Sequence, residues 1–196
     1  MHWPTLTACA MAAAFLAGAA KAGDLPSVQE KMDTCLACHG VRGVSENDGV
    51  PSLAGEPDLF IQWQLVFFRS GRLKSEIMDP IAAELSDTDI RALGKAVATL
   101  PPAQLPATTD SDPKLTAFGS QLAGERHCNS CHGASFAGQQ ATPRLAGQRE
   151  EVLVKALHDY KSGARFGTGV AAMPEVASQL EDHDIEALAH YLSHLR

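Results

Sequence analysis

Two short stretches decide how this chain folds: Cys35-Leu36-Ala37-Cys38-His39 and Cys128-Asn129-Ser130-Cys131-His132. The C-x-x-C-H pattern is typical of c-type haem attachment. Two thiols three positions apart on a helical turn can each add to a haem vinyl group, and the adjacent histidine then lies under the iron as its proximal ligand. The sequence therefore predicts two covalently bound haem c groups. The predicted attachment residues are Cys35, Cys38, Cys128 and Cys131, and the predicted proximal ligands are His39 and His132.

Three other uses of these cysteines were considered. Zinc sites built from two C-x-x-C pairs usually separate the pairs by about 15–20 residues, whereas some 90 residues intervene here. A thioredoxin-like dithiol is expected in a βαβ setting, and the surrounding pattern is helical. Simple disulfides within each pair remain an alternative if haem is never attached.

The second half of the chain repeats the first. An offset of 92 residues aligns Pro51-Ser52-Leu53-Ala54-Gly55 with Pro143-Arg144-Leu145-Ala146-Gly147, and an offset of 95 then pairs Met78 with Met173. The two C-x-x-C-H runs lie 93 residues apart. One gene duplication explains all of these matches, so we expect two tandem domains of the same fold.

Helical periodicity and punctuation set the expected domain limits. Apolar residues recur at i, i+3 and i+4 after each repeated loop, and Ser86 is a good N-cap with Asp89 in the first turn. Alternating strand patterns are absent, which predicts an all-α protein. A proline-rich stretch between the repeats has linker composition. The expected division is a signal peptide at 1–22, an N-terminal domain at 23–100, a linker at 101–113 and a C-terminal domain at 114–196.

The first residues predict export. The stretch 6–20 carries no charge, and Ala20-Lys21-Ala22 is an A-x-A site. This arrangement is typical of a secretory signal peptide, here cut after Ala22, and the apolar run is too short for a membrane span. Cys9 then leaves with the signal, and we expect the mature protein in the periplasm.

Composition excludes one large class of partner. The chain has 196 residues and a formal net charge of −7, which argues against nucleic-acid binding through phosphate contacts. An acidic surface fits a basic patch on a protein partner better. Each domain is also small enough that an apolar cofactor would be needed to complete its core.

The sixth ligand of each iron can be argued by elimination. After His39 the chain has no histidine until His127, so the first domain cannot supply a second histidine downstream of its own motif. Met78 and Met173 lie at matched repeat positions, about 40 residues after each motif histidine. They are the predicted sixth ligands. In the second domain four histidines, expected on solvated helix surface, stay as alternatives: His158, His183, His190 and His194.

Residues around the irons can be assigned more loosely. A metal-bound histidine normally donates its remaining N–H to a carbonyl or carboxylate, and the repeated loops at Pro51 and Pro143 are candidates to provide that carbonyl. Tight turns without such a role are the alternative. Candidates to pair with the haem propionates, or else to lie solvated on the surface, are Arg69, Arg72, Arg144, Lys161 and Arg165.

The ordered set of motifs resembles the dihaem cytochrome c4 family, over nearly the whole mature chain. The resemblance implies two cytochrome c domains facing one another, His/Met coordination of each iron, and a periplasmic location with loose membrane association in many members. It further implies transfer of electrons from a quinol-oxidising complex toward a terminal oxidase. Ser52 stands where the second copy has Arg144, so the two haem surroundings are unequal.

Iron that is closed on both axial sides can exchange an electron but cannot bind substrate. We therefore expect a one-electron carrier of a respiratory chain rather than an enzyme. The alternatives are the cytochrome subunit of a dehydrogenase complex, a dihaem enzyme such as thiosulfate dehydrogenase or a peroxidase, and a haem gas sensor. The enzymes and the sensor would need an open iron position, which the paired methionines argue against.

Overall fold

The computed structural model describes residues 27–102, 112–166 and 172–195, and over these ranges it is helical without strands. The predicted all-α class is confirmed. The signal peptide and most of the predicted linker fall outside the described residues. In chain order the described helices are α1 (Val28–His39), α2 (Asp58–Arg69), α3 (Met78–Ala83), α4 (Asp87–Ala98), α5 (Pro113–Glu125), α6 (Asn129–His132), α7 (Glu150–Lys161), α8 (Ala172–Ser178) and α9 (Asp182–Ser193).

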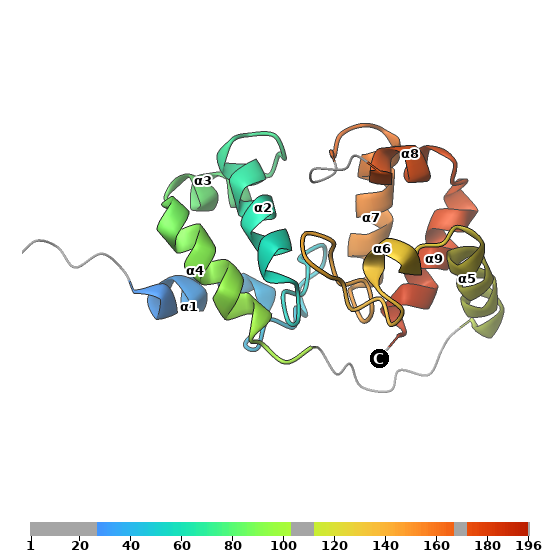
Figure 1. Ribbon diagram of the computed structural model, residues 1–196, viewed down its shortest axis with the longest axis horizontal. Helices are drawn as coiled ribbons and strands as arrows, with labels where there is room; N and C mark the ends of the chain where they lie inside the picture. The colour runs from blue at the N-terminus through green and yellow to red at the C-terminus, as the bar shows by residue number, and fades with distance from the viewer. Residues whose placement is uncertain (1–26, 103–111, 167–171, 196) are drawn as a thin grey trace, which may run out of the picture.

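The helices form two groups, α1 to α4 and α5 to α9, that lie side by side (Figure 1). In the first group α4 packs against both α1 and α2. The start of α4 is held by the predicted cap, because the Ser86 hydroxyl accepts the Asp89 amide at 3.2 Å and the Asp89 carboxylate accepts the Ser86 amide at 2.9 Å. The buried apolar cluster of this domain consists of Met32, Ile61, Leu65, Leu85, Ile90, Leu93 and Val97.

The second group is built on a close contact between α5 and α9. Gly119 of α5 makes the approach feasible, since a Cβ at this position would lie 2.0 Å from the carbonyl oxygen of Ala187. Helix α7 packs on the other side of α9 and also contacts α8. The buried apolar cluster of this domain consists of Leu122, Ala123, Phe136, Ala146, Leu153, Leu180, Ile185, Leu188, Ala189 and Leu192.

The two copies differ where they carry the cysteine motif. In the first domain the whole motif lies at the end of α1, which runs without a break to His39. In the second domain the chain leaves α5 at Glu125, and His127 adopts a φ of +51° before the short α6 begins. The duplicated motif therefore sits on two different local supports.

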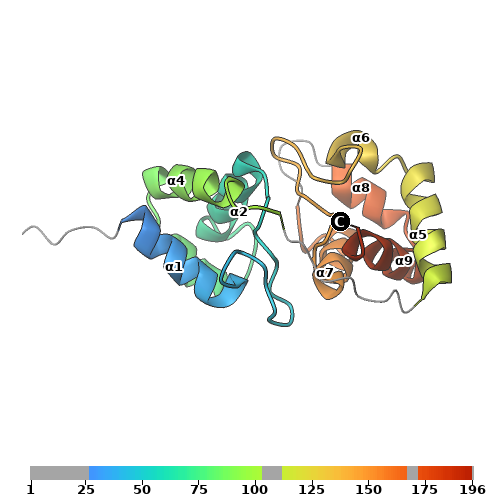
Figure 2. The same ribbon diagram turned by 90° about the horizontal axis from the view of Figure 1, so that it is seen from below.

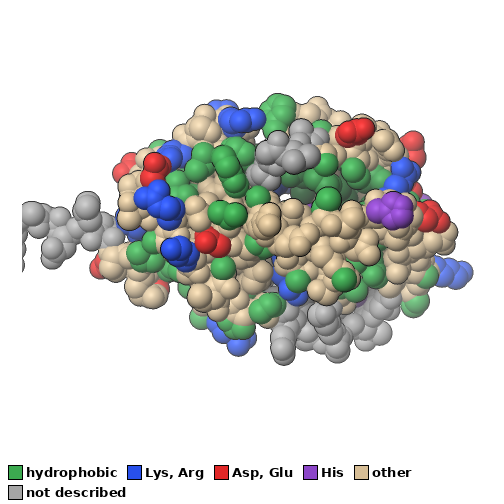
Figure 3. All heavy atoms as spheres, in the orientation of Figure 1, with side chains coloured by type: hydrophobic (Ala, Val, Ile, Leu, Met, Phe, Trp, Pro, Cys, Tyr) green, Lys and Arg blue, Asp and Glu red, His purple; other side chains and the backbone are tan. Residues whose placement is uncertain are grey.

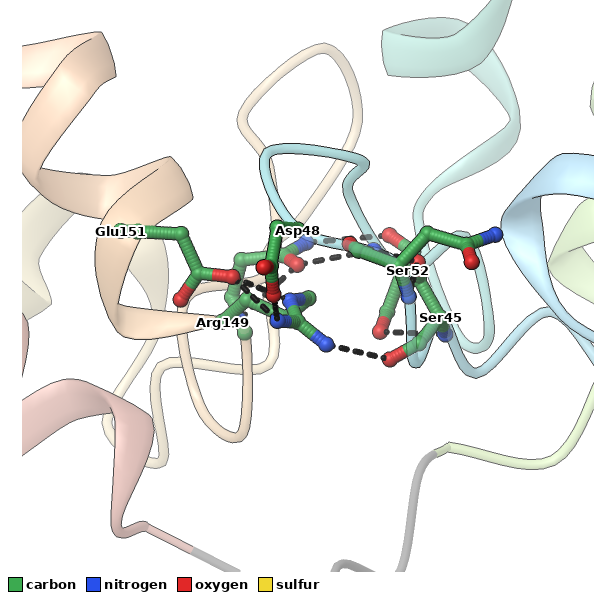
Figure 4. Close-up of polar contacts among 7 residues, drawn as sticks. Ser45, Asp48, Ser52, Arg149 and Glu151 are labelled. Atoms are coloured by element: carbon green, nitrogen blue, oxygen red, sulfur yellow. Dashed lines mark hydrogen bonds and ion pairs between the residues drawn. The ribbon is translucent and has the colours of Figure 1, made fainter.

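The domains meet through loops rather than through helix packing. The loop between α1 and α2 faces the loop between α6 and α7 (Figures 1 and 2). Gln148 bonds Ser52 twice, and Arg149 donates to the Ser45 carbonyl and to Asp48, each at 3.1 Å (Figure 4). The junction is thus polar and hydrogen-bonded, which fixes how the two domains face one another.

Candidate haem sites

Helix geometry brings the two thiols of each motif together. Residues three apart in a helix share a face, and Cys35 and Cys38 are three apart in the last turns of α1. Cys128 and Cys131 have the same spacing at α6. All four are free thiols, so the disulfide alternative finds no support in the structure. Burial raises the pKa of the Cys35 thiol and that of Cys128.

Each motif histidine is buried and held by one hydrogen bond. His39 and His132 are only 8% and 5% exposed. Their Nδ1 atoms lie 2.8 Å and 2.9 Å from the carbonyl oxygens of Pro51 and Pro143. Because a carbonyl can only accept, Nδ1 carries the proton and Nε2 keeps its lone pair for a metal. The predicted role of the two proline loops is confirmed.

The same environment keeps these rings neutral. Burial lowers the pKa of His39 and of His132, and the bond to the proline carbonyl only partly opposes this. A neutral imidazole with a fixed tautomer is the form that ligates iron. Both histidine rings therefore have the protonation state and the orientation that a metal ligand needs.

The proline loops are anchored identically in the two copies. The Gly43 carbonyl accepts the amides of Leu53 and Ala54, at 2.7 Å and 2.9 Å. In the second domain the Phe136 carbonyl accepts the amides of Leu145 and Ala146, at 2.8 Å and 3.1 Å. Both Gly43 and Phe136 have positive φ, of 73° and 55°. This backbone bend places each proline carbonyl above its histidine.

The two methionines lie at the starts of two short helices, α3 and α8. Met78 is the first residue of α3 and is half-buried against the N-terminal apolar cluster. Met173 is half-buried near the start of α8. The Met78 amide donates to the Ser75 hydroxyl at 3.1 Å, which holds the start of α3. Each domain thus has one thioether on a short helix in the part of the chain after its motif.

Comparisons with known proteins agree with this pattern. The Cytochrome c family model matches residues 116–196. Cytochrome c4 of Thiocapsa roseopersicina is 33% identical over 190 residues, which cover 91% of this chain and 96% of that protein. The chain belongs to the cytochrome c4 family. The crystal structure of reduced cytochrome c4 from Pseudomonas stutzeri matches with a TM-score of 0.78 at 29% identity, over 86% of this chain and 97% of that one.

Two further relatives are linked to thiosulfate oxidation. The thiosulfate dehydrogenase electron acceptor of Stutzerimonas stutzeri is 30% identical, over 100% of this chain and 95% of that protein. A thiosulfate dehydrogenase structure from Marichromatium purpuratum matches with a TM-score of 0.71 at 32% identity, over 81% of this chain and 36% of that one.

Membership of the cytochrome c4 family settles the cofactor and the class of function. The protein binds two haem c groups and is an electron-transfer protein, not an enzyme. Its two tandem all-α cytochrome c domains are those of the family. No helix within the described ranges is both long and apolar enough to cross a membrane.

Large apolar side chains are exposed close in sequence to two of the predicted ligands. Val41, two residues after His39, is 90% exposed, and Ile77, next to Met78, is 66% exposed. In the second domain Phe166 is 55% exposed. Figure 3 shows hydrophobic side chains gathered on both sides of the domain junction. A contiguous patch of exposed apolar side chains can mark a binding surface, and a bound haem would offer apolar area to such a patch.

Three of the basic residues predicted as candidates for the haem propionates make contacts with other side chains of the protein. Arg69 joins the end of α2 to Asp87 at the start of α4, at 2.6 Å. Lys161 joins the end of α7 to Asp182 at the start of α9, at 3.2 Å. These are repeat-equivalent ties between helix ends. Arg165 reaches across the junction, where it donates to Gln64 at 2.8 Å.

One expectation about the histidines is wrong. His190 was expected on solvated helix surface, but it is 4% exposed and its Nδ1 lies 3.1 Å from the Glu150 carboxylate. The His190 ring is buried because its helix, α9, packs against both α5 and α7. His158 and His183 are exposed, as expected, and His183 stacks on Phe118.

Sequence reasoning missed two residues at the junction. Glu56 and Gln148 are only 4% and 7% exposed, and they follow the two repeated Pro-x-Leu-Ala-Gly loops at the same offset of 92. That shared position was the available signal, because a polar residue after a repeated buried loop needs a partner. The partner proved to lie in the other domain, which the offset alone does not reveal.

Proposed function

We propose that the protein is a periplasmic one-electron carrier in which each iron is closed by histidine and methionine. Cys35, Cys38, Cys128 and Cys131 would attach the two haems; His39 with Met78, and His132 with Met173, would ligate the two irons. The observation that carries this proposal is the pair of buried histidines whose Nδ1 protons are bound by Pro51 and Pro143 carbonyls. That bond leaves Nε2 as the ring atom that faces a metal.

The chain supplies position and environment, while haem iron supplies the exchange between its ferric and ferrous states. The thiols anchor the group, and the proline carbonyls orient the histidine rings. The methionines would serve as the second ligands, would keep water from the metal, and would favour the ferrous state. With histidine and methionine both bound, no position would remain for a substrate, which agrees with a carrier.

Export and partners follow from the sequence expectations. The proposed signal peptide, 1–22, would direct the chain to the periplasm, where the 23–100 and 114–196 domains would each receive a haem. A quinol-oxidising complex as donor and a terminal oxidase as acceptor are the proposed partners. The formal net charge of −7 supports docking on basic surfaces.

A second candidate partner is a thiosulfate-oxidising enzyme. It is favoured by the similarity to the thiosulfate dehydrogenase electron acceptor of Stutzerimonas stutzeri, which spans 100% of this chain. In this role the protein would accept electrons from the enzyme and pass them on. Both candidates use the same two haems and differ only in the donor.

The coordination is tested by absorption and EPR spectra of the purified protein with both haems attached. We expect two low-spin His/Met signals in the oxidised state and no reaction of the reduced protein with carbon monoxide. A high-spin signal, or ready binding of carbon monoxide at either iron, would overturn the proposal.

The donor is tested by stopped-flow reduction. The oxidised protein is mixed with membranes that hold a quinol-oxidising complex, or with a thiosulfate dehydrogenase and thiosulfate. Rapid reduction that slows as salt is added identifies the physiological class of donor, since exposed charge contacts are screened. Equal, slow reduction in both mixtures would contradict both partner assignments.

A further inference from the structure

Each domain places one buried side chain against the Pro-x-Leu-Ala-Gly loop of the other domain. The Glu56 carboxylate accepts the backbone amide of Arg144 at 3.0 Å. In the opposite direction, the Gln148 side-chain oxygen accepts the backbone amide of Ser52 at 2.9 Å. Glu56 and Gln148 are equivalent positions of the duplication. The exchange is therefore a pseudo-symmetric pair of contacts, with one chemical difference between its halves.

Both contacts end on the peptide units that orient the motif histidines. The Pro143–Arg144 peptide accepts His132 Nδ1–H at its carbonyl, at 2.9 Å, and donates its N–H to Glu56. The Pro51–Ser52 peptide accepts His39 at 2.8 Å and donates to Gln148. Hydrogen bonds in such chains polarise one another. Each histidine is thus linked through one peptide to a side chain of the other domain.

The difference lies in what the terminal side chain can do. Gln148 is neutral at every pH, whereas Glu56 can release a proton. A carboxylate on the amide N–H polarises the peptide and makes its carbonyl a stronger acceptor. The stronger carbonyl draws more strongly on the Nδ1 proton and raises the basicity of Nε2. A more basic ligand favours ferric iron, as does the added negative charge, so both effects lower the potential.

We propose that Glu56, a residue of the N-terminal domain, sets the redox potential of the C-terminal haem and makes it depend on pH. This inference rests on the proposed ligation by His132. Glu56 acts through the Pro143–Arg144 peptide and so is a positioning residue. Reduction of the C-terminal haem takes one electron from the donor protein and draws part of a proton from solvent onto Glu56. Oxidation releases both.

The surroundings of Glu56 put its ionisation within the physiological range. Burial raises the pKa of Glu56 to about 8, against the opposing effects of the Arg144 amide, the Arg144 charge, the Gln148 side chain and the Arg165 charge. An arginine guanidinium carries its charge throughout this pH range as a matter of its chemistry. Glu56 is therefore the group in this pocket that changes charge near neutrality.

The test uses redox titration of the protein with both haems attached, between pH 6 and pH 10, for the native chain and two variants. In the native chain the C-terminal potential should fall as the pH rises through the ionisation of Glu56, while the N-terminal potential stays nearly level. Glu56→Gln should remove that fall. At pH 9.5 it should raise the ratio of reduced to oxidised C-terminal haem about tenfold, which is about 59 mV for one electron.

The repeat offers a matched reciprocal variant. Gln148→Glu places an ionisable group on the Pro51–Ser52 peptide, so the N-terminal haem should gain a pH dependence while the C-terminal haem keeps its own. A second readout is the NMR signal of the Nδ1–H proton in the reduced protein. The His132 signal should move with pH in the native chain and stay still in Glu56→Gln, whereas a packing role alone would leave the pH profile unchanged.

Failure of this inference is distinct from failure of the proposed function. A level C-terminal potential from pH 6 to pH 10 in the native chain, with two low-spin His/Met spectra, would overturn the role of Glu56 and leave the carrier intact. Spectra without His132 ligation would overturn both. If Glu56→Gln does not fold, the native pH profile and Gln148→Glu still decide the question.

Discussion

As the proposed second iron ligand of the N-terminal domain, the Met78 thioether would favour ferrous iron, so its removal should act on the potential rather than on attachment. We expect Met78→Ala to open the first iron and to lower its potential by on the order of 0.1 V, within the ~0.8 V that axial ligands span. The second haem, for which Met173 is the proposed ligand, should be nearly unchanged. Spectroelectrochemistry resolves the two. Retention of both thioether-ligated spectra would refute the ligand assignment.

Covalent attachment of each haem to its cysteine pair can be tested by mass. Replacing Cys128 and Cys131 together by alanine should leave one haem per chain, because the second group would lose both covalent anchors. Mass spectrometry of the denatured protein counts the haems that remain. The matched control replaces Cys35 and Cys38, which should also leave one haem, in the other domain. Two retained haems in either variant would contradict the attachment site.

Residue types alone predict the candidate anchors and ligands of each site. The cysteine and histidine spacing indicates an anchor and a proximal ligand, since this chemistry depends on a local helical turn, and both assignments stay predictions. The proline carbonyls could be predicted too, because they lie in a repeated loop 12 and 11 residues after the two histidines. Glu56 could not be predicted as a neighbour of Arg144, since their contact depends on how two separate domains dock.

At the scale of helices, close packing of α5 on α9 depends on Gly119. We expect Gly119→Ala to destabilise the C-terminal domain by about 1–3 kcal/mol, because its methyl group would meet the backbone of Ala187, which cannot move aside as a side chain can. Gly124→Ala is the control in the same helix: no atom lies within 4 Å of its added carbon, and alanine favours helix by about 1 kcal/mol. Denaturant unfolding distinguishes the two. Equal stabilities would contradict the packing role.

Helix limits show how far a repeat predicts local structure. The caps and apolar spacing of α4 were predicted because they depend on nearby residues, and Ser86 with Asp89 forms the expected pair. The break between α5 and α6 was not predicted, because the two motifs share the same C-x-x-C-H pattern. His127 adopts a positive φ there, and the long packing of α5 against α9 sets the direction from which the chain arrives. Tertiary contacts, not the motif, decide that difference.

For the whole molecule, the buried junction makes stability depend on pH in a direction that identifies the group responsible. The folded protein raises the pKa of Glu56 from 4.5 to about 8, so the unfolded chain binds fewer protons between these values and stability falls as pH rises. Glu56→Gln should therefore be more stable than the native chain at pH 8, by on the order of 3 kcal/mol, with the difference vanishing near pH 4.5. Denaturant unfolding at several pH values measures this.

Glu151, at the same junction, gives the control of opposite sign. Burial acts to raise the pKa of Glu151, but hydrogen bonds from its own backbone, from Arg149 and from Gly49, together with the Arg149 charge, lower it on balance. Its contribution is thus present above the unfolded pKa and is lost as pH falls. Glu151→Gln should cost a little stability at neutral pH and nothing at low pH. If the stability of both variants changed with pH in the same direction, the pH dependence would belong to the junction as a whole. The assignment of the fall in stability above pH 4.5 to Glu56 would then be wrong.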